Sequence, residues 1–359
     1  MLGIKKTYTL PFKFEIPNYS ADFIEKKPLI KMWFKYIKRY LFINLKNQKL
    51  LEIKRILPKH RNILWINISA PSLGDSLMDL SSRTMLKGRK VDLFTDKKNA
   101  ELYKDDFLFS TIYTDKKKVD KKKYDLVIID SYSPRCIHIK SYIAKLTPFV
   151  GMYGYYNGPE VNRVLFSFHQ MNNLLGYAKN EDEINKIAKT SISISCRDRD
   201  IIQKINLPSD FIAFAIGGEW SYRIYNKWDL IIEKLLTQDS DLNIVLIGSS
   251  NAKQSVKRII DKFSGCKVYS YVDQFSFNQT AEIIRHASIL FCCDGGLMHS
   301  ANAVNTPIVA LFARLTDQMQ LTDSIRAFSI YDKNDVNNIS VKDVLLKYKE
   351  ATIFFHSRL

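Results

Sequence analysis

Residues 289–313 constrain the fold of this chain more than any other stretch. An apolar run ends at Asp294 and two glycines, and a segment of small residues follows with His299 near its start. A second apolar run begins after Pro307. This order predicts a strand, a glycine turn, a helix and another strand, which is the repeating unit of a parallel sheet. It also places a helix N-terminus, where backbone N–H groups bind anions, at the carboxyl edge of that sheet.

The same alternation runs through most of the chain and predicts an α/β protein with two doubly wound parallel sheets. We expect a basic, largely helical extension over 1–60, one Rossmann-like domain over 61–200, a second over 201–340 and a final helix over 341–359. The crossing between the domains is expected near 190–208. The expected strands are 63–68, 91–95, 111–113, 126–130 and 148–152 in the first domain, and 211–216, 243–247, 267–269, 289–293, 308–313 and 327–331 in the second.

Composition narrows the class of protein. The chain has 359 residues, of which 46% are hydrophobic and 25% charged, as in globular proteins. No apolar run is long enough to span a bilayer, and no secretory signal opens the sequence, so we expect a cytoplasmic protein. The five cysteines show no metal-ligand spacing, so we expect them to be reduced and structural, and we expect no metal site.

The net charge of +17 is unevenly distributed. Residues 1–60 contain 14 Lys and Arg against four Asp and Glu, and residues 116–123 form a second basic cluster. Such patches attract nucleic acids, anionic membranes or acidic substrates, although a solvated face explains them equally well. No recognised nucleic-acid module is present, so we expect no nucleic-acid partner.

Residues 28–57 have the pattern of a helix in which apolar and basic side chains occupy different faces. We expect the apolar stripe to pack on the domain's own core, with a membrane surface as the alternative. The stripe consists of Ile30, Trp33, Phe34, Ile37 and Leu41, and the basic residues are Lys31, Lys35, Lys38 and Arg39.

Three loops at the carboxyl ends of expected strands contain candidate functional residues, because ligands bind there in open α/β sheets. In the first, Asp75 begins a helix expected to run through residue 85. Its carboxylate could cap that helix or serve as a general base, and the spacing favours capping.

The second loop follows the first strand of the second domain. Gly217 and Gly218 let the backbone approach a ligand closely. Ser221, Arg223 and Lys227 could hold phosphate oxygens or could simply be solvated. The next residue, Trp228, is expected to pack in the core.

In the third loop, the glycines after Asp294 offer free backbone N–H groups to a diphosphate. His299 either donates to that phosphate or belongs to a buried polar network. The loop matches neither the dinucleotide-binding nor the P-loop fingerprint.

Together the three loops resemble glycosyltransferase family 9, whose best-known members are ADP-heptose:lipopolysaccharide heptosyltransferases. The resemblance rests on Gly74-Asp75, on Gly217-Gly218 with Lys227-Trp228, and on Asp294-Gly-Gly-Leu-Met-His299 followed by Thr306-Pro307. It covers about residues 62–330.

The resemblance implies a GT-B fold, with two Rossmann-like domains on either side of a central cleft. It implies an inverting transferase that needs no metal and has Asp75 as general base, which agrees with the lack of an Asp-x-Asp motif at the end of an expected strand. The acceptor would lie near Ser72 and Gly74. The nucleotide-sugar, expected to be ADP-heptose, would lie on Gly217, Gly218, Ser221, Arg223, Lys227, Asp294, Gly295, Gly296, Leu297 and His299.

Three departures from the family pattern leave another nucleotide-sugar as an alternative. Asn226 occupies the usual lysine position, with Lys227 one residue later. Gly295 replaces a threonine and removes a hydroxyl group. Ala252 lies where an acidic residue often holds the ribose.

The resemblance gives the basic extension a role, since an inner-core lipopolysaccharide acceptor is an acidic glycolipid on the inner face of the inner membrane. A peripheral enzyme on that anionic surface is therefore expected. The alternatives are a nucleotide-sugar epimerase of the same fold and a non-catalytic relative that binds sugars or polyanions.

Overall fold

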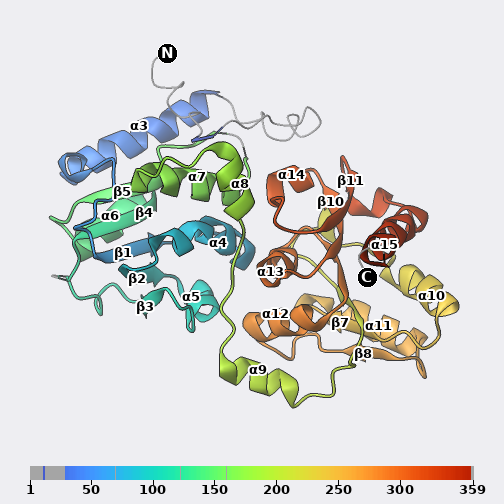
Figure 1. Ribbon diagram of the computed structural model, residues 1–359. Coiled ribbons are helices and arrows are strands. Elements are labelled where there is room, and N and C mark those ends of the chain that lie inside the picture. The colour runs from blue at the N-terminus through green and yellow to red at the C-terminus, as the bar shows by residue number, and fades with distance from the viewer. Residues whose placement is uncertain (1–10, 13–28, 69, 122, 159, 357–359) are drawn as a thin grey trace. The chain divides into compact units, whose positions relative to one another are not determined.

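The computed structural model describes residues 11–12, 29–68, 70–121, 123–158 and 160–356 (Figure 1). Its contacts divide the chain into two compact units, Met1–Lys189 and Thr190–Leu359. Each unit contains one parallel sheet with helices packed against it.

The sheet of unit 1 has five strands in the order β3-β2-β1-β4-β5, and every pair is parallel. The chain starts in the middle at β1, moves outward to one edge, and then returns to build the other side, as in a Rossmann fold. The middle strand is buried on both faces, since Ile63, Leu64, Trp65 and Ile66 have no exposed surface. The strands are β1 (Asn62–Asn67), β2 (Lys90–Thr95), β3 (Phe109–Tyr113), β4 (Leu126–Ser131) and β5 (Phe149–Gly154).

The helices of unit 1 differ from expectation at two places. The helix predicted from Asp75 through residue 85 ends as an α-helix at Asp79 and continues as a 3-10 turn, Ser81–Leu86. That turn directs Arg83 into a fully buried ion pair with Asp106, 2.7 Å away. The helices are α3 (Leu29–Leu45), η1 (Lys49–Leu51), α4 (Leu73–Asp79), η2 (Ser81–Leu86), α5 (Lys97–Tyr103), α6 (Pro134–Ile143), α7 (Arg163–Leu175) and α8 (Glu181–Ile187).

The helix predicted over 28–57 is the second difference. It ends at Leu45, and Asn47 then adopts a left-handed backbone with φ 52°. After the short turn η1, the chain runs back to the sheet, where Glu52 forms a bridge beside Phe149. Asn tolerates the left-handed conformation better than most residues, which explains why the helix stops here.

The prediction that the apolar stripe of α3 packs on the core is wrong. Met32, Arg39 and Ile43 are the buried side chains of this helix, and the guanidinium of Arg39 donates to the carbonyl of Tyr156 at 2.8 Å. The buried face of α3 therefore contains an arginine between two apolar side chains, and the carbonyl of Tyr156 satisfies that arginine. The stripe itself is largely exposed: Ile30 63%, Trp33 40%, Phe34 59% and Leu41 54%.

The sheet of unit 2 has six parallel strands in the order β11-β10-β9-β6-β7-β8. Counted from β6, this is the Rossmann order 3-2-1-4-5-6. The strands are β6 (Ile212–Ala215), β7 (Ile244–Ile247), β8 (Val268–Ser270), β9 (Ile289–Cys293), β10 (Ile308–Ala313) and β11 (Ala327–Asp332). The opening stretch of sequence thus forms β9, a helix and β10, as predicted.

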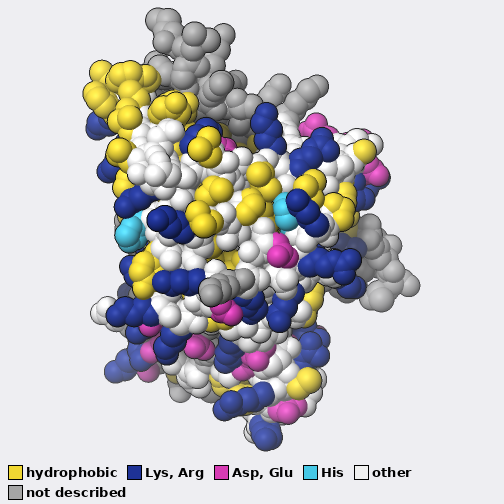
Figure 2. All heavy atoms as spheres, turned by 90° about the vertical axis from the view of Figure 1, so that its left-hand side faces the viewer, with side chains coloured by type: hydrophobic (Ala, Val, Ile, Leu, Met, Phe, Trp, Pro, Cys, Tyr) yellow, Lys and Arg dark blue, Asp and Glu magenta, His cyan; other side chains and the backbone are white. Residues whose placement is uncertain are grey.

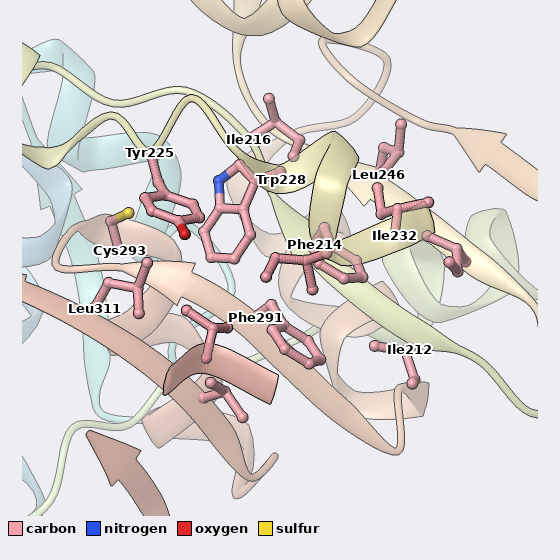
Figure 3. Close-up of a cluster of buried hydrophobic side chains, with 14 of the residues drawn as sticks. Ile212, Phe214, Ile216, Tyr225, Trp228, Ile232, Leu246, Phe291, Cys293 and Leu311 are labelled. Carbon is pink, nitrogen blue, oxygen red and sulfur yellow. The ribbon is translucent and has the colours of Figure 1, made fainter. Parts of the chain in front are cut away.

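Helices of unit 2 pack their apolar sides on this sheet around an aromatic cluster (Figure 3). Trp228 is 3% exposed, and its ring lies 5.6 Å from Phe214 and 4.8 Å from Tyr225. Its predicted core role is confirmed. The helices are α9 (Cys196–Gln203), η3 (Ser221–Arg223), α10 (Trp228–Gln238), η4 (Ser250–Ala252), α11 (Lys253–Lys262), α12 (Phe277–His286), α13 (Gly296–Val304), α14 (Asp317–Gln320), η5 (Val336–Asn338) and α15 (Val341–His356).

Candidate functional site

The topology of each sheet marks one place where a ligand is expected. Where strand order reverses, the loops that leave two neighbouring strands diverge to opposite faces and open a crevice at the carboxyl edge. In unit 1 this switch point lies between β1 and β4, and in unit 2 between β6 and β9. The loop of Asp75 follows β1, and the loops of Gly217 and Asp294 follow β6 and β9. Each candidate loop therefore lies at a switch point.

Asp75 does not cap α4, although the spacing favoured that interpretation. The N-cap is Ser72, whose hydroxyl oxygen accepts the backbone N–H of Asp75 at 3.1 Å. The same hydroxyl donates its proton to Asp75 Oδ2 at 2.6 Å. The N-cap residue Ser72 thus orients the carboxylate of Asp75, which does not itself cap the helix. The side chain of Asp75 remains 22% exposed.

Arg163, the first residue of α7, holds the same carboxylate from the other side. One Nη of its guanidinium donates to Asp75 Oδ1. The rest forms a fork on Asp79, with Nε to Oδ1 at 2.8 Å and the other Nη to Oδ2 at 2.6 Å. Burial alone would lower the pKa of Arg163, but the negative charge of Asp79, and then that of Asp75, raises it well above its usual value. One arginine therefore binds two carboxylates.

Two further contacts fix this network. Tyr153, at the end of β5, donates its hydroxyl to Asp79 Oδ1 at 2.6 Å. Burial and the charge of Asp79 raise the pKa of Tyr153 well above its usual value, so this hydroxyl remains a donor. Asn162 caps α7 by accepting the backbone N–H of Leu165 at 3.1 Å, which places Arg163 in the first helical turn.

Buried polar groups connect α4 to the sheet. Asn67, the last residue of β1, donates to Asp130 in β4 at 3.1 Å, and Ser76 in α4 donates to Asn67 at 3.1 Å. Tyr103 meets the Ser76 hydroxyl at 3.1 Å. Buried hydrogen bonds of this kind make the position of the helix specific, and here they set the place of Asp75.

In unit 2, Gly217 adopts a left-handed backbone with φ 91°. A Cβ on it would lie 2.7 Å from Asn251 Oδ1, and Asn251 Nδ2 donates to the carbonyl of Gly218 at 2.7 Å. The loop after β7 therefore packs on the glycine loop after β6. In the region where an acidic ribose-binding residue was expected, Asn251 holds this loop and Ala252 is buried.

The loops after β6 and β9 meet through an ion pair. Arg223 Nη lies 3.1 Å from Asp294 Oδ2, and the Asp294 side chain is 2% exposed. Arg223 Nε is buried and has no hydrogen-bond partner among the described residues. The pair thus fixes a guanidinium at the switch point.

The first turn of α13 has the features predicted for an anion site. No side chain caps the helix, whose N-cap is Gly295, and Gly295, Gly296 and Leu297 are partly exposed. Gly295 is extended, with φ 172°, and the nearest atom to a Cβ on it would be 3.9 Å away. His299 is 2% exposed, and its carbonyl accepts the hydroxyl of Thr190 at 3.0 Å.

Lys227 is engaged elsewhere. Its ammonium donates to the carbonyls of Asn337 at 2.5 Å and Ile339 at 3.2 Å, so two of its three N–H groups hold the turn η5. Ser221 and Asn226 are exposed. Among the predicted donor residues, the structure therefore brings Arg223 and Asp294 together, but it binds Lys227 to backbone carbonyls.

Sequence reasoning missed two cations at these edges. Arg163 is the first residue of α7, a helix that we did not predict from the sequence. Arg314 follows β10, and its guanidinium lies 3.8 Å from the ring centre of Tyr222, which in turn stacks with the exposed Trp220. A cation directly after an apolar strand was the available signal for Arg314, whereas no local signal marks Arg163.

Two Rossmann-like units, each with polar loops at its switch point, are the components of a GT-B fold. The family model of glycosyltransferase family 9 (heptosyltransferase) matches residues 154–345, more than half of the chain. The chain therefore belongs to glycosyltransferase family 9 and is a heptosyltransferase-like enzyme of the GT-B fold.

Solved structures agree with this fold. The chain is similar to a family 9 glycosyl transferase from Veillonella parvula, with a TM-score of 0.66, 13% identity and coverage of 81% of this chain and 96% of that chain. It is also similar to the E. coli ADP-heptose lps heptosyltransferase II, with a TM-score of 0.64, 17% identity and coverage of 82% of this chain and 99% of that chain. The structure of the E. coli heptosyltransferase WaaC with ADP has a TM-score of 0.61 and 15% identity, and the match covers 80% of this chain and 99% of that chain. A comparison with curated proteins found no match.

Among the helices that the structure describes, none is both long and apolar enough to cross a membrane. No group of three or more His, Cys, Asp or Glu in the described part of the chain is arranged to hold a metal ion. None of the five cysteines, all of which lie in the described residues, forms a disulfide there, and Cys136, Cys292 and Cys293 are buried.

Proposed function

We propose that this enzyme transfers a heptose, or a related sugar, from a nucleotide-sugar to a hydroxyl group of a lipopolysaccharide or lipooligosaccharide inner core. The observation that supports it most strongly is the carboxylate of Asp75. It is partly exposed in the switch-point loop of unit 1 and is oriented by Ser72 and Arg163. A fixed, accessible carboxylate is what deprotonation of an acceptor hydroxyl requires.

In the proposed reaction, Asp75 accepts the proton of the acceptor hydroxyl while that oxygen attacks the anomeric carbon. The bond from the anomeric carbon to the diphosphate oxygen breaks, and the nucleoside diphosphate leaves with the electron pair. Attack opposite the leaving group inverts the anomeric centre. The proton passes from Asp75 to solvent. Ser72 and Gly74 border the acceptor at the start of α4.

The developing charge on the diphosphate needs fixed donors. We assign this role to the first turn of α13 and to Arg223, whose buried Nε–H has no partner among the described residues. Arg314 adds a cation at the end of β10. No step of this scheme needs a metal ion. ADP-heptose is the proposed donor because solved structures of the similar E. coli WaaC hold ADP and ADP-2-deoxy-2-fluoro heptose.

The surface charge suits an acidic glycolipid acceptor. The net charge is +17, and many Lys and Arg side chains lie on the face shown in Figure 2. Lys31, Lys35 and Lys38 are exposed along α3 beside its apolar stripe. An amphipathic helix with one basic edge lies in the interface of an anionic bilayer. We therefore place the enzyme in the cytoplasm, peripheral to the inner face of the inner membrane.

The test is a donor-consumption assay with ADP-heptose, with and without a heptose-deficient inner-core lipooligosaccharide. The proposal predicts release of ADP that depends on the acceptor, together with a product larger by one heptose. Chemical change of the sugar in ADP-heptose in the mixture without acceptor would identify an epimerase. Binding of ADP-heptose without ADP release in either mixture would identify a non-catalytic relative.

A further inference from the structure

A cavity of about 720 Å³ lies within unit 1, beside the carboxyl ends of β4 and β5. Tyrosines dominate its wall, and they come from three separate parts of the chain: α3, the end of β4, and the end of β5 with the loop after it. It is lined by Pro11, Tyr36, Tyr40, Lys49, Glu52, Tyr132, Gly151, Met152, Tyr153, Gly154, Tyr155, Tyr156, Phe166, Gln170 and Asn173. We call it the tyrosine cavity. The mechanism proposed above does not use it.

The helix α3 supplies one wall. Tyr36 and Tyr40 lie one turn apart on α3, with ring centres 6.4 Å apart and nearly parallel planes. Tyr36 also meets Tyr155, from the loop after β5, at 5.0 Å. The extension before the first sheet strand therefore completes this site, and the Rossmann core alone does not form it.

The opposite wall is fixed by close packing. Tyr132 donates its hydroxyl to Glu52 at 2.6 Å, and its ring meets that of Tyr155 edge to face at 4.7 Å. A Cβ on Gly151 would lie 2.5 Å from the Tyr132 ring, so only glycine leaves room for it. Rigid aromatic walls bind a ligand with little loss of side-chain entropy.

The polar groups of the cavity indicate the class of ligand. Lys49 and Glu52 form an ion pair, which leaves this wall without a net charge. The hydroxyl of Tyr155 is buried and has no hydrogen-bond partner among the described residues. Aromatic faces combined with polar tips suit a ligand that is apolar on its ring faces and polar around its rim. A neutral pyranose has this chemistry, because C–H groups cover its faces and hydroxyls its edge.

The tyrosine cavity and the Asp75 network share a residue. Tyr153 lines the cavity and donates to Asp79, which Arg163 links to Asp75. We propose that the tyrosine cavity binds a neutral hexose or heptose residue of the acceptor saccharide, next to the sugar that receives the new linkage. This inference rests on the proposed function, because it assigns the bound sugar to the acceptor.

Saturation-transfer NMR without any nucleotide-sugar tests the proposal separately from turnover. The probes are L-glycero-D-manno-heptose and the methyl α-pyranosides of glucose, galactose and mannose. We expect at least one probe to bind. Tyr40→Ala, which removes a wall, and Tyr155→Phe, which removes only the unpartnered hydroxyl, should each weaken binding about fivefold to tenfold. Tyr177→Ala is the matched control, because Tyr177 is 48% exposed, Tyr40 is 45% exposed, and Tyr177 does not line the cavity.

No binding of any probe by the folded wild type would overturn the proposal. Equal binding by wild type and Tyr155→Phe, or equal losses in Tyr40→Ala and Tyr177→Ala, would overturn it too. Melting curves of all variants identify any that fail to fold, and Tyr155→Phe keeps the ring packing. Acceptor-independent consumption of ADP-heptose would reject the proposed function while leaving these binding results unchanged, so the two failures are distinguishable.

Discussion

Arg163, at the start of α7, binds Asp75 in the first turn of α4, so the candidate base has a cation as its immediate neighbour. The same guanidinium forks onto Asp79, which is 2% exposed. Arg163 is therefore a positioning residue in the proposed mechanism. It orients Asp75 for the acceptor and balances a second carboxylate that is buried beside it.

Replacement of Arg163 separates these roles. Arg163→Gln leaves Asp79 buried without its cation, and we expect a stability loss of about 3–5 kcal/mol and a strong loss of kcat. Arg163→Lys keeps a charge but not the fork, so it should recover most of the stability and little of kcat. Urea unfolding and steady-state kinetics measure the two effects. Full kcat in Arg163→Lys would show that orientation by the fork is unnecessary.

Gly217, in the loop after β6, and Gly265, between α11 and β8, allow a matched pair of variants. Gly217→Ala forces a left-handed backbone on alanine and brings its Cβ to 2.7 Å from Asn251, whereas Gly265→Ala has nearly the same φ, 89°, in open space. Both should lose about 1 kcal/mol of stability from backbone strain. Gly217→Ala alone should also weaken ADP binding, measured by calorimetry. Equal ADP affinity in the two variants would exclude a role for this loop in donor binding.

Gly295 permits a gain-of-function test. Its extended backbone and open surroundings accept a side chain, so Gly295→Thr should fold normally and restore the hydroxyl of the family pattern. One added hydrogen bond of about 0.5–1.5 kcal/mol predicts ADP binding about twofold to tenfold tighter. Calorimetry with ADP measures the change. Weaker binding in a folded variant would mean that ligand phosphates do not approach this turn.

The exposed stripe of α3 predicts membrane binding. Trp33→Ser with Phe34→Ser should reduce sedimentation with anionic liposomes without unfolding the domain, because both side chains face solvent. Phe107→Ser, at a residue that is 67% exposed outside the stripe, is the control. High salt should weaken binding further, since each lysine near the surface contributes about 1 kcal/mol. Unchanged sedimentation of the double variant would contradict this role of α3.

A buried lysine predicts a pH dependence of stability. Lys140 has no exposed surface, and burial lowers its pKa to about 7. The unfolded lysine keeps a pKa near 10.4, so the unfolded state binds more protons between these values. Stability should therefore rise as pH increases from about 7 toward 9.5. The rise should be smaller in Lys140→Met, as urea unfolding across this range can show. Equal slopes in both proteins would mean that Lys140 stays charged when buried.

The sequence predicted the sheets well because parallel strands buried on both faces are continuous apolar runs that end in polar or glycine turns. It failed where a side chain's partner lies far away in sequence. The apolar stripe of α3 was expected inside, yet it is largely exposed, and the buried Arg39 donates to the carbonyl of Tyr156, 117 residues away. The residues around Asp75 contain no pattern that predicts its contact with Arg163, which is 88 residues away. Local patterns thus located the candidate loops but not their ionic partners.

The central claim is that Asp75 takes the acceptor's proton, and Asp75→Asn tests it most directly. The variant keeps the size of the side chain and should bind ADP as the wild type does. Asp105→Asn, at an exposed aspartate, is the matched control. We predict that acceptor-dependent ADP release falls at least about a hundredfold in Asp75→Asn and stays at the wild-type rate in Asp105→Asn. Release at a rate near wild type from Asp75→Asn would contradict the account.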